Sequence, residues 1–392
     1  MKIGIFGGSY NPIHLAHVQM AEAVTNEFGL DQCVFMIAGD PPHKQLSGKI
    51  RPQDRLAMAC ITAEQLGNNK LFVCDYELKK DGPSYTVDTL AFLHERFPND
   101  ELFLIVGADM LCTFKSWKEP ERIARIAKII AVKRPGQESS GSFRTACESL
   151  RSDLGAQIYE SETEVKDISS TLVRKYVEEA RPIRNLVMPG VEEYIYANAL
   201  YSPSCIHYIT LDLQKRLSIK RFRHSVSTMR EAILLADRYG ADREKCRTAA
   251  LIHDCEKVSG QDAIMLAHRY GVELDEYEVS APGLIHAKLG AHMAQIRYGI
   301  KDQEILDAVE YHTTGAPYMS DIAMITYLAD CTEAMRSYAE VDELRRATWS
   351  SLEEGMLLSF ELSEKNLAAI GKTVHPRTLA AKEWLTEKMK NN

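Results

Sequence analysis

Short apolar runs alternate with amphipathic stretches along the first half of the chain. Several of these runs are separated by segments with helical periodicity. Apolar runs of this length, with helices between them, are typical of parallel strands that are covered on both faces. The pattern therefore predicts an α/β domain with a doubly wound parallel sheet, of the Rossmann-like kind. The expected strands lie at residues 3–6, 33–37, 71–75, 102–106 and 129–132.

From about residue 211 the strand-like runs disappear and long helical patterns replace them. This change predicts an all-α second domain. A Ser-Pro-Ser sequence at residues 202–204 interrupts the pattern between the halves, and a chain of 392 residues suits two domains. We therefore expect domains at residues 1–202 and 203–392. Helices are expected in the second at residues 226–239, 243–254, 302–311, 324–335 and 379–389.

The composition narrows the setting in which the protein works. A net charge of −8 argues against an electrostatic nucleic-acid binder. Nine cysteines without a CxxC pair indicate free thiols in a reducing compartment. The chain opens on a strand-like segment instead of a leader, and no apolar run is long enough to cross a bilayer. We expect a cytoplasmic protein without a membrane or nucleic-acid partner, and leave open whether it forms a homo-oligomer.

A double-glycine turn follows the first predicted strand and leads into a helix that begins near His14. Gly7 and Gly8 let the backbone approach a phosphate closely, and a helix start offers free amides to an anion. His14 and His17 are three residues apart, so they share a helix face and can donate hydrogen bonds to phosphate oxygens. Two surface histidines on an ordinary strand–turn–helix unit are the alternative. The glycine turn and the proline that follows it favour the phosphate site.

Three further segments fit the same chemistry. The Pro-Pro-His-Lys run at residues 41–44 follows the second strand, at the sheet edge where open α/β sheets bind ligands. Asp109 follows another strand at that edge, and it fits either a ribose contact or a helix cap. Ser169, Ser170 and Arg174 at the start of a helix would form a second phosphate cradle. A plain cap with a solvent-exposed arginine is the alternative for this last segment.

These motifs resemble those of bacterial nicotinate-nucleotide adenylyltransferases, within the HxGH nucleotidyltransferase superfamily, over about residues 1–200. The resemblance implies that AMP is transferred from ATP to nicotinate mononucleotide, which gives deamido-NAD and pyrophosphate with the help of Mg²⁺. It rests on residues 7–17, 41–44, 84–90, 106–117 and 168–174. It implies catalytic roles for His14 and His17, ATP binding by Gly7, Gly8, Ser9, Asp109, Ser169, Ser170 and Arg174, and mononucleotide binding by Lys44, Thr86, Trp117 and Arg134.

Two of these positions carry a physical argument of their own. An indole such as that of Trp117 stacks well on an electron-poor pyridine ring, although a core tryptophan is the alternative. Ala16 departs from the family pattern, which has glycine between the two histidines. Its methyl group would crowd a nucleotide at a place where the backbone must come close.

Histidines and aspartates recur on the predicted helices of the second half. His253 and Asp254 adjoin an apolar stretch at residues 249–252, where both side chains are costly unless they are paired or bound to a metal. Bundle metal sites are built from helices that each supply one or two inward ligands. Mixed His/Asp ligation without a cysteine pattern suits a transition metal. The candidate ligands are His224, His253, Asp254, His286, His312 and Asp330.

This set resembles that of HD phosphohydrolases, and more narrowly of small bacterial HD domains that split diadenosine tetraphosphate symmetrically to ADP. The resemblance covers about residues 205–392, and the run at residues 333–336 departs from its pattern. It implies iron as the metal and a catalytic role for Asp254. By the same resemblance, one metal would be held by His224, His253, Asp254 and Asp330, and a second with the help of His286 and His312.

Two alternatives stay open for the second half. It could hydrolyse another nucleotide, such as a cyclic dinucleotide or a nucleoside triphosphate, although no GYP signature follows the HD motif. It could instead be a catalytically silent nucleotide sensor that regulates the transferase. A pure binding module would not need six residues of the metal-ligating type.

Overall fold

The computed structural model describes residues 1–39, 50–133, 141–258 and 260–391. The chain divides into two compact units. The first comprises Met1–Lys175 and Ile183–Tyr194, and the second comprises Tyr176–Pro182 and Ile195–Asn392. A domain boundary after residue 202 stays a prediction.

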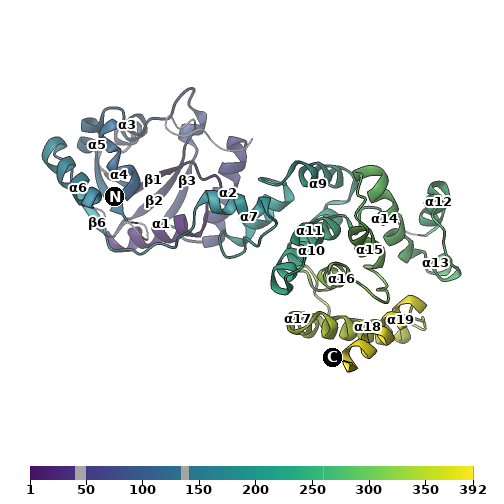
Figure 1. Ribbon diagram of the computed structural model, residues 1–392. Coiled ribbons are helices and arrows are strands. Elements are labelled where there is room, and N and C mark those ends of the chain that lie inside the picture. The colour runs from purple at the N-terminus through teal and green to yellow at the C-terminus, as the bar shows by residue number, and fades with distance from the viewer. Residues whose placement is uncertain (40–49, 134–140, 259, 392) are drawn as a thin grey trace. The chain divides into compact units, whose positions relative to one another are not determined.

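The first unit contains a six-stranded parallel sheet, which confirms the predicted fold class (Figure 1). The strand order is β3-β2-β1-β4-β5-β6, so it reverses between β1 and β4. In open α/β sheets the connections diverge at such a reversal and leave a crevice at the carboxyl ends of the two strands. The strands are β1 (Lys2–Gly8), β2 (Gln32–Ile37), β3 (Leu71–Cys74), β4 (Glu101–Gly107), β5 (Ala127–Val132) and β6 (Ile158–Ser161).

Both faces of the sheet are buried because helices cover each of them. Ile3 and Ile5 share one core with Leu90 and Leu150, whereas the neighbouring Phe6 faces the ring of His17. This alternation explains why the strands are apolar at nearly every position. The helices and 3₁₀ turns are α1 (Leu15–Glu27), α2 (Pro52–Leu66), η1 (Tyr76–Lys79), α3 (Thr86–Arg96), α4 (Ala108–Cys112), η2 (Phe114–Ser116), α5 (Pro120–Ile126), α6 (Gly141–Leu154), α7 (Ser170–Glu178) and α8 (Pro189–Ala197).

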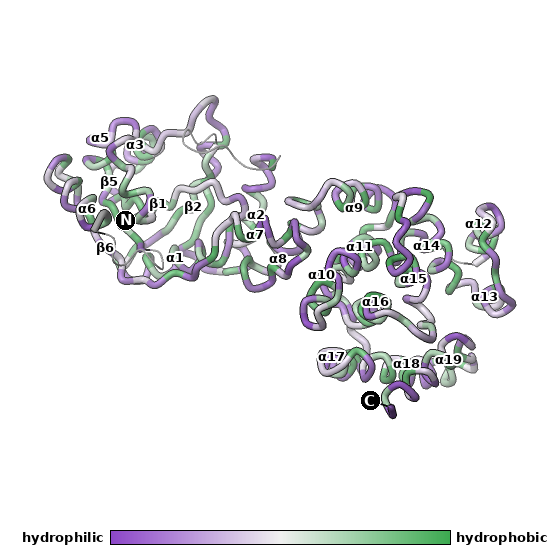
Figure 2. Tube along the Cα trace, viewed as in Figure 1, coloured by the Kyte–Doolittle hydropathy of each residue, from purple (hydrophilic) through white to green (hydrophobic). Residues whose placement is uncertain are grey.

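In the second unit the described residues form helices and no strand, as predicted. Helix α16 packs against α10, α11, α15, α17 and α18, and Figure 2 shows it as a hydrophobic segment. A helix that is apolar all round is one that others enclose. The helices and the 3₁₀ turn of this unit are α9 (Ser204–Arg216), α10 (Ile219–Tyr239), α11 (Arg243–Ile252), α12 (Gln261–Tyr270), α13 (Glu276–Ser280), η3 (Pro282–Leu284), α14 (Ile285–Tyr298), α15 (Gln303–Tyr311), α16 (Asp321–Thr332), α17 (Val341–Ser350), α18 (Leu352–Ala369) and α19 (Pro376–Lys390).

Some predicted bounds need correction. Helix α11 ends at Ile252, so His253 and Asp254 lie in the turn beyond it and not on the helix. Helix α10 begins at Ile219, seven residues before the predicted start, because Ser218 caps it. Strand β6 was missed, since it is short and only its two end residues are buried. Among the described helices, none has the length and the apolar run that crossing a bilayer requires.

Arg55 connects the loops that follow β1 and β2. It is fully buried, and its Nη1 donates to the carbonyl oxygens of Ser9 (2.8 Å) and Ala38 (2.7 Å). Its Nη2 donates to the carbonyl oxygen of Gly39 at 3.2 Å. One guanidinium group therefore fixes the ends of two neighbouring strands where the crevice begins.

We expect Arg55→Met to lower the free energy of unfolding of the first unit by about 3 kcal/mol or more, since each buried carbonyl that loses its partner costs about 1–3 kcal/mol. Urea unfolding followed by circular dichroism measures the change. Arg96→Met is the control, because Arg96 is exposed at the end of α3. Equal unfolding midpoints for the two variants would contradict this role of Arg55.

Candidate active sites

A cavity of about 440 Å³ lies where the strand order reverses. Its walls include the carboxyl ends of β1 and β4 and the start of α3. This is the place where an open α/β sheet is expected to bind a ligand. Seven of the predicted site residues line it, namely Gly7, Gly8, Ser9, His17, Thr86, Asp109 and Trp117.

The two glycines of the first turn have different tasks. A Cβ atom at Gly8 would lie 2.8 Å from the ring of Tyr10, so glycine is needed there for packing. A Cβ atom at Gly7 would meet nothing within 4 Å. Gly7 is therefore the position that leaves space for a ligand beside the backbone, as the sequence predicted for both.

His14 and His17 stack on each other at the start of α1. Their ring centroids are 3.6 Å apart, and the rings are inclined by 24°. The main-chain N–H of His14 donates to Nδ1 of His17 at 3.2 Å, so a neutral His17 ring carries its proton on Nε2. His17 lines the cavity, whereas the buried His14 does not. His14 thus supports His17 from behind in this structure.

The start of α7 contacts the segment that precedes these histidines. Ser170 Oγ donates to the carbonyl oxygen of Pro12 at 2.8 Å, and Arg174 Nη1 donates to that of Asn11 at 2.7 Å. Ser169 Oγ accepts the N–H of Leu172, as a helix cap does. The structure brings the predicted second cradle to the residues before His14, although none of its three side chains lines the cavity.

Of the four remaining predicted positions, the structure describes Asp109 and Ala16. Asp109 is the second residue of α4, and Gly107 occupies the N-cap position, so Asp109 does not cap the helix. Asp109 lines the cavity instead. Ala16 is buried and is not among the cavity residues, so its methyl group does not project into the space for a ligand. Lys44 and Arg134 lie outside the described residues.

Glu77 is a residue of the cavity that the sequence analysis missed. It is buried, and burial raises the pKa of its carboxyl group. Thr89 Oγ1 donates to its Oε1 at 2.6 Å, and Ser84 accepts the N–H of Gly39 at 3.2 Å nearby. Its sequence surroundings, Tyr-Glu-Leu-Lys, match no motif of the site and so gave no sign of its role.

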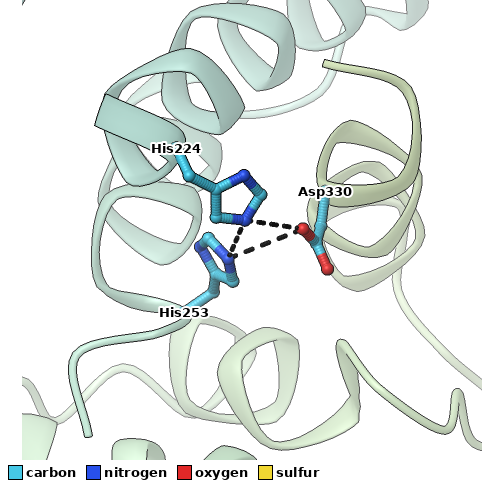
Figure 3. Close-up of side chains that lie close together, drawn as sticks. All are labelled: His224, His253 and Asp330. Carbon is cyan, nitrogen blue, oxygen red and sulfur yellow. Dashed lines mark hydrogen bonds and ion pairs between the residues drawn. The ribbon is translucent and has the colours of Figure 1, made fainter. Parts of the chain in front are cut away.

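The second unit holds a compact group of imidazoles and carboxylates. His224 on α10, His253 in the turn after α11 and Asp330 on α16 face one another (Figure 3). The Nε2 atom of His224 lies 2.9 Å from Oδ1 of Asp330 and 3.3 Å from Nε2 of His253. All three residues are far apart in the sequence, so the helical packing creates this group.

Asp254 joins this group to a second pair of histidines. Its Oδ1 lies 3.1 Å from Nε2 of His286 and 3.6 Å from Nε2 of His312, and these two nitrogens are 3.1 Å apart. Its Oδ2 lies 3.5 Å from Nε2 of His253 and 3.8 Å from Nε2 of His224. The structure therefore brings together all six candidate metal ligands, with Asp254 between the two imidazole pairs.

The hydrogen bonds of these rings fix which nitrogen carries the proton. A carbonyl oxygen only accepts, so a ring nitrogen facing one must be the donor, and Nε2 of a neutral ring then keeps a lone pair. Two such lone pairs that face each other repel unless a cation lies between them. In three rings Nδ1 faces a main-chain carbonyl oxygen: that of Ala250 for His253 (2.7 Å), Gly283 for His286 (2.6 Å) and Val309 for His312 (2.7 Å).

The pKa shifts of Asp254 and His286 agree with a metal site. Burial would lower the pKa of His224, but its contacts with Asp330 and Glu333 raise it. Burial alone would raise the pKa of Asp254, but its contacts with His253, His286 and His312 outweigh burial and hold that pKa far below its usual range. Burial lowers the pKa of His286 to about 4. Ionised carboxylates and neutral imidazoles are the forms that bind metal ions. The donor set therefore fits one or two transition-metal ions.

A third group, Asp275, Glu278 and His375, has the residue types of a metal site but not its hydrogen bonds. Nδ1 of His375 accepts the N–H of Arg377 at 3.0 Å, so the ring proton sits on Nε2. That nitrogen lies 3.5 Å from Oδ2 of Asp275. A neutral ring N–H therefore faces the carboxylate of Asp275, and neither ring nitrogen keeps a free lone pair for a metal ion.

Three cationic side chains contact the carboxylates of the metal group. Arg221 and Lys257 contact Asp254, and Arg336 contacts Asp330. About a third of each of these side chains is exposed, against 2% for Asp254. These three side chains therefore mark the solvent-exposed side of the site. Arg336 contacts Asp330 even though residues 333–336 depart from the sequence pattern of the HD domains.

Comparisons with known proteins assign the two halves of the chain to two different families. The cytidylyltransferase-like family matches residues 5–176, and the HD domain matches residues 221–335. A probable nicotinate-nucleotide adenylyltransferase of Syntrophotalea carbinolica is 36% identical over 214 residues, which cover 51% of this chain and 97% of that protein. One of Salinibacter ruber is 38% identical over 204 residues and is covered completely, with 52% of this chain.

Among solved structures, a predicted HD superfamily hydrolase involved in NAD metabolism from Clostridium acetobutylicum is 37% identical, with a TM-score of 0.45. The match covers 46% of this chain and 96% of that one. Fold and sites define a nucleotidyltransferase-type α/β unit followed by a helical unit with an HD domain. Through its first half, the chain belongs to the nicotinate-nucleotide adenylyltransferase family.

We expect transition-metal ions to stabilise the second unit, because they relieve the repulsion between facing imidazole nitrogens. A ligand at one hundred times its Kd adds about 2.7 kcal/mol of stability, a shift of several degrees in Tm. Scanning calorimetry of chelator-treated protein with and without Mn²⁺ measures it. Asp254→Ala should abolish the shift, and a shift that persists in this variant would place the metal elsewhere.

Proposed function

We propose that the protein is a bifunctional enzyme. Residues 1–202 transfer AMP from ATP to nicotinate mononucleotide, and residues 203–392 hydrolyse diadenosine tetraphosphate symmetrically to ADP. The observation that carries the proposal is that each unit gathers its own phosphate-handling groups. These groups are the cavity at the strand reversal and the metal-type cluster of six ligands.

In the transferase reaction, a phosphate oxygen of the mononucleotide bonds to the α-phosphorus of ATP while the bond from that phosphorus to the bridging oxygen breaks. Pyrophosphate leaves with the bonding electrons, and no covalent enzyme intermediate forms. Mg²⁺ would supply charge neutralisation when it is bound with ATP. His17, as an Nε2–H donor that lines the cavity, stabilises the charge that develops on the phosphate oxygens.

The substrates divide the cavity between them. Gly7, Ser9 and Asp109 lie at the ends of β1 and β4, where we place the ATP. Thr86 and Trp117 line another part of the wall, where we place the pyridine ring of the mononucleotide. By resemblance, Gly8, His14, Ser169, Ser170 and Arg174 complete the ATP site, and Lys44 and Arg134 complete the mononucleotide site.

The HD domain supports a metal-dependent phosphohydrolase, and the resemblance points to diadenosine tetraphosphate as substrate and iron as metal. Bound ions would supply Lewis-acid activation of a water molecule and of the phosphate oxygens. Arg221, Lys257 and Arg336 stand at the open side and would hold the polyphosphate. The water oxygen bonds to one of the two inner phosphorus atoms, the central P–O–P bond breaks, and two ADP molecules form.

A substrate panel on three proteins tests both halves. We expect His17→Ala to reduce dinucleotide synthesis at least about 100-fold, because a charge-stabilising donor is lost. The same variant should hydrolyse diadenosine tetraphosphate normally. Asp254→Ala should show the reverse, since Asp254 contacts both imidazole pairs. If hydrolysis is faster with a cyclic dinucleotide or a nucleoside triphosphate, the proposed substrate is wrong. If the metal-loaded wild type cleaves none of them, the sensor alternative holds.

We expect Trp117→Ala to raise the KM for nicotinate mononucleotide about tenfold or more, because loss of ring stacking costs about 1–3 kcal/mol. The KM for ATP should not change. Steady-state kinetics with each substrate varied in turn measures this. Trp349→Ala is the matched control, since Trp349 is a partly exposed tryptophan of the second unit. Equal increases in both KM values would indicate a core tryptophan instead.

A further inference from the structure

We propose that Glu333 is a positioning residue for the metal ligand His224, and that it makes one half of the HD cluster the tighter metal subsite. That half consists of His224, His253 and Asp330. The inference rests on the proposed metal-dependent function. It concerns a carboxylate that would touch neither substrate nor metal.

Glu333 lies behind His224, on the side away from the other ligands. Its Oε1 is 3.1 Å from Nδ1 of His224, the nitrogen opposite the one that faces Asp330. Glu333 is only 1% exposed, and its Oε2 accepts the N–H of Met335 at 2.6 Å. Both carboxylate oxygens are therefore engaged, and the acid has one defined orientation against the ring.

The main chain around Glu333 is held as firmly as its side chain. Glu333 is the C-cap residue directly after α16, three positions after the ligand Asp330. Arg345 donates to the carbonyl oxygens of Thr332 (2.9 Å), Glu333 (2.9 Å) and Arg336 (3.1 Å). The end of α16 therefore supplies both the ligand Asp330 and the carboxylate of Glu333, which orients the ligand His224.

His224 differs from the other three histidines of the site in the group that its Nδ1 atom contacts. In those rings Nδ1 donates to a neutral main-chain carbonyl oxygen, whereas in His224 it faces a carboxylate. A charged acceptor gives a stronger hydrogen bond and makes the opposite ring nitrogen a better electron donor. A metal ion on Nε2 of His224 should consequently be bound more tightly than one on the other pair.

Lys257 is the cationic side chain that borders the half of the cluster formed by His286 and His312. Lys257 Nζ lies 2.8 Å from Nε2 of His286 and 3.2 Å from Oδ1 of Asp254. A lysine ammonium this close repels a metal ion bound to the same atoms. Arg336 contacts Asp330 and Arg221 contacts Oδ2 of Asp254 in the same way, so cationic side chains border both halves. The carboxylate behind His224 therefore carries the difference between the halves, and the cluster should fill in two steps.

Titration of metal-stripped, full-length protein with Co²⁺ tests the inference, with calorimetry and the visible spectrum of the bound ion as readouts. We expect two binding steps in the wild type. Glu333→Gln keeps an acceptor oxygen for Nδ1 of His224 but removes the charge. The Glu333→Gln change should weaken metal binding in the tighter step by about 10- to 100-fold. A loss of this size is usual when a metal-binding histidine loses the carboxylate that holds its other ring nitrogen. The weaker step should not change. The Tm of the stripped protein should fall somewhat, because the amide N–H₂ of the variant then faces the N–H of Met335, so the difference between the two binding steps is the readout that decides.

Glu343→Gln is the matched control, because Glu343 is exposed on the neighbouring helix α17 and should leave both steps as they are. Lys257→Met provides an independent variant that should tighten the weaker step alone. Two equal steps in the wild type, or a Glu333→Gln protein that binds like the wild type or weakly in both steps, would overturn the inference. A wild type that binds no metal would overturn the proposed hydrolase as well.

Discussion

Four imidazole rings in the helical unit point their Nε2 atoms at the buried Asp254 and the partly buried Asp330, and within each pair these nitrogens are only 3.1–3.3 Å apart. In His253, His286 and His312 a hydrogen bond from Nδ1 to a main-chain carbonyl oxygen leaves a lone pair on Nε2, so a cation at the centre stabilises the arrangement. Apolar packing of α10 and α11 against α16 brings the ligands of distant elements to this point. The apolar α16, enclosed by five other helices, carries Asp330 to that point.

The first unit meets the opposite requirement, since it must accept negative charge. Among its described residues, a glycine turn and a ring N–H donor line a cavity at the strand reversal. Arg55 fixes the loops at the mouth of this cavity by three hydrogen bonds to carbonyl oxygens. The two units thus have different arrangements for binding phosphate groups: N–H donors around a cavity in the first, and a cluster of His and Asp side chains that fits metal ions in the second.

Much of this organisation could be predicted from the sequence. Buried parallel strands are apolar throughout, so five of the six were visible as runs, whereas the edge strand β6 is half exposed and was not. The six ligands of the HD group stood out because charged groups beside apolar stretches need partners. The resemblance to known families supplied the roles of the residues, which geometry alone does not give.

Other features depend on contacts that no sequence pattern encodes. Glu77, Arg55 and Glu333 are buried polar residues in ordinary helical or turn surroundings, so their burial appears only after the chain has folded. The same holds for the difference between Gly7 and Gly8, which rests on the ring of Tyr10. Hydrogen bonds at Nδ1 likewise separate the HD cluster from the group around His375, although both contain the same residue types.

The most direct test of the metal-centred account is X-ray diffraction from crystals of the full-length protein, recorded on both sides of the absorption edge of the metal that fluorescence identifies. The account predicts two anomalous peaks, one beside His224, His253 and Asp330 and one beside His286 and His312, with Asp254 touching both. A site without anomalous signal after loading with the metal, or a peak only beside His375, would contradict it.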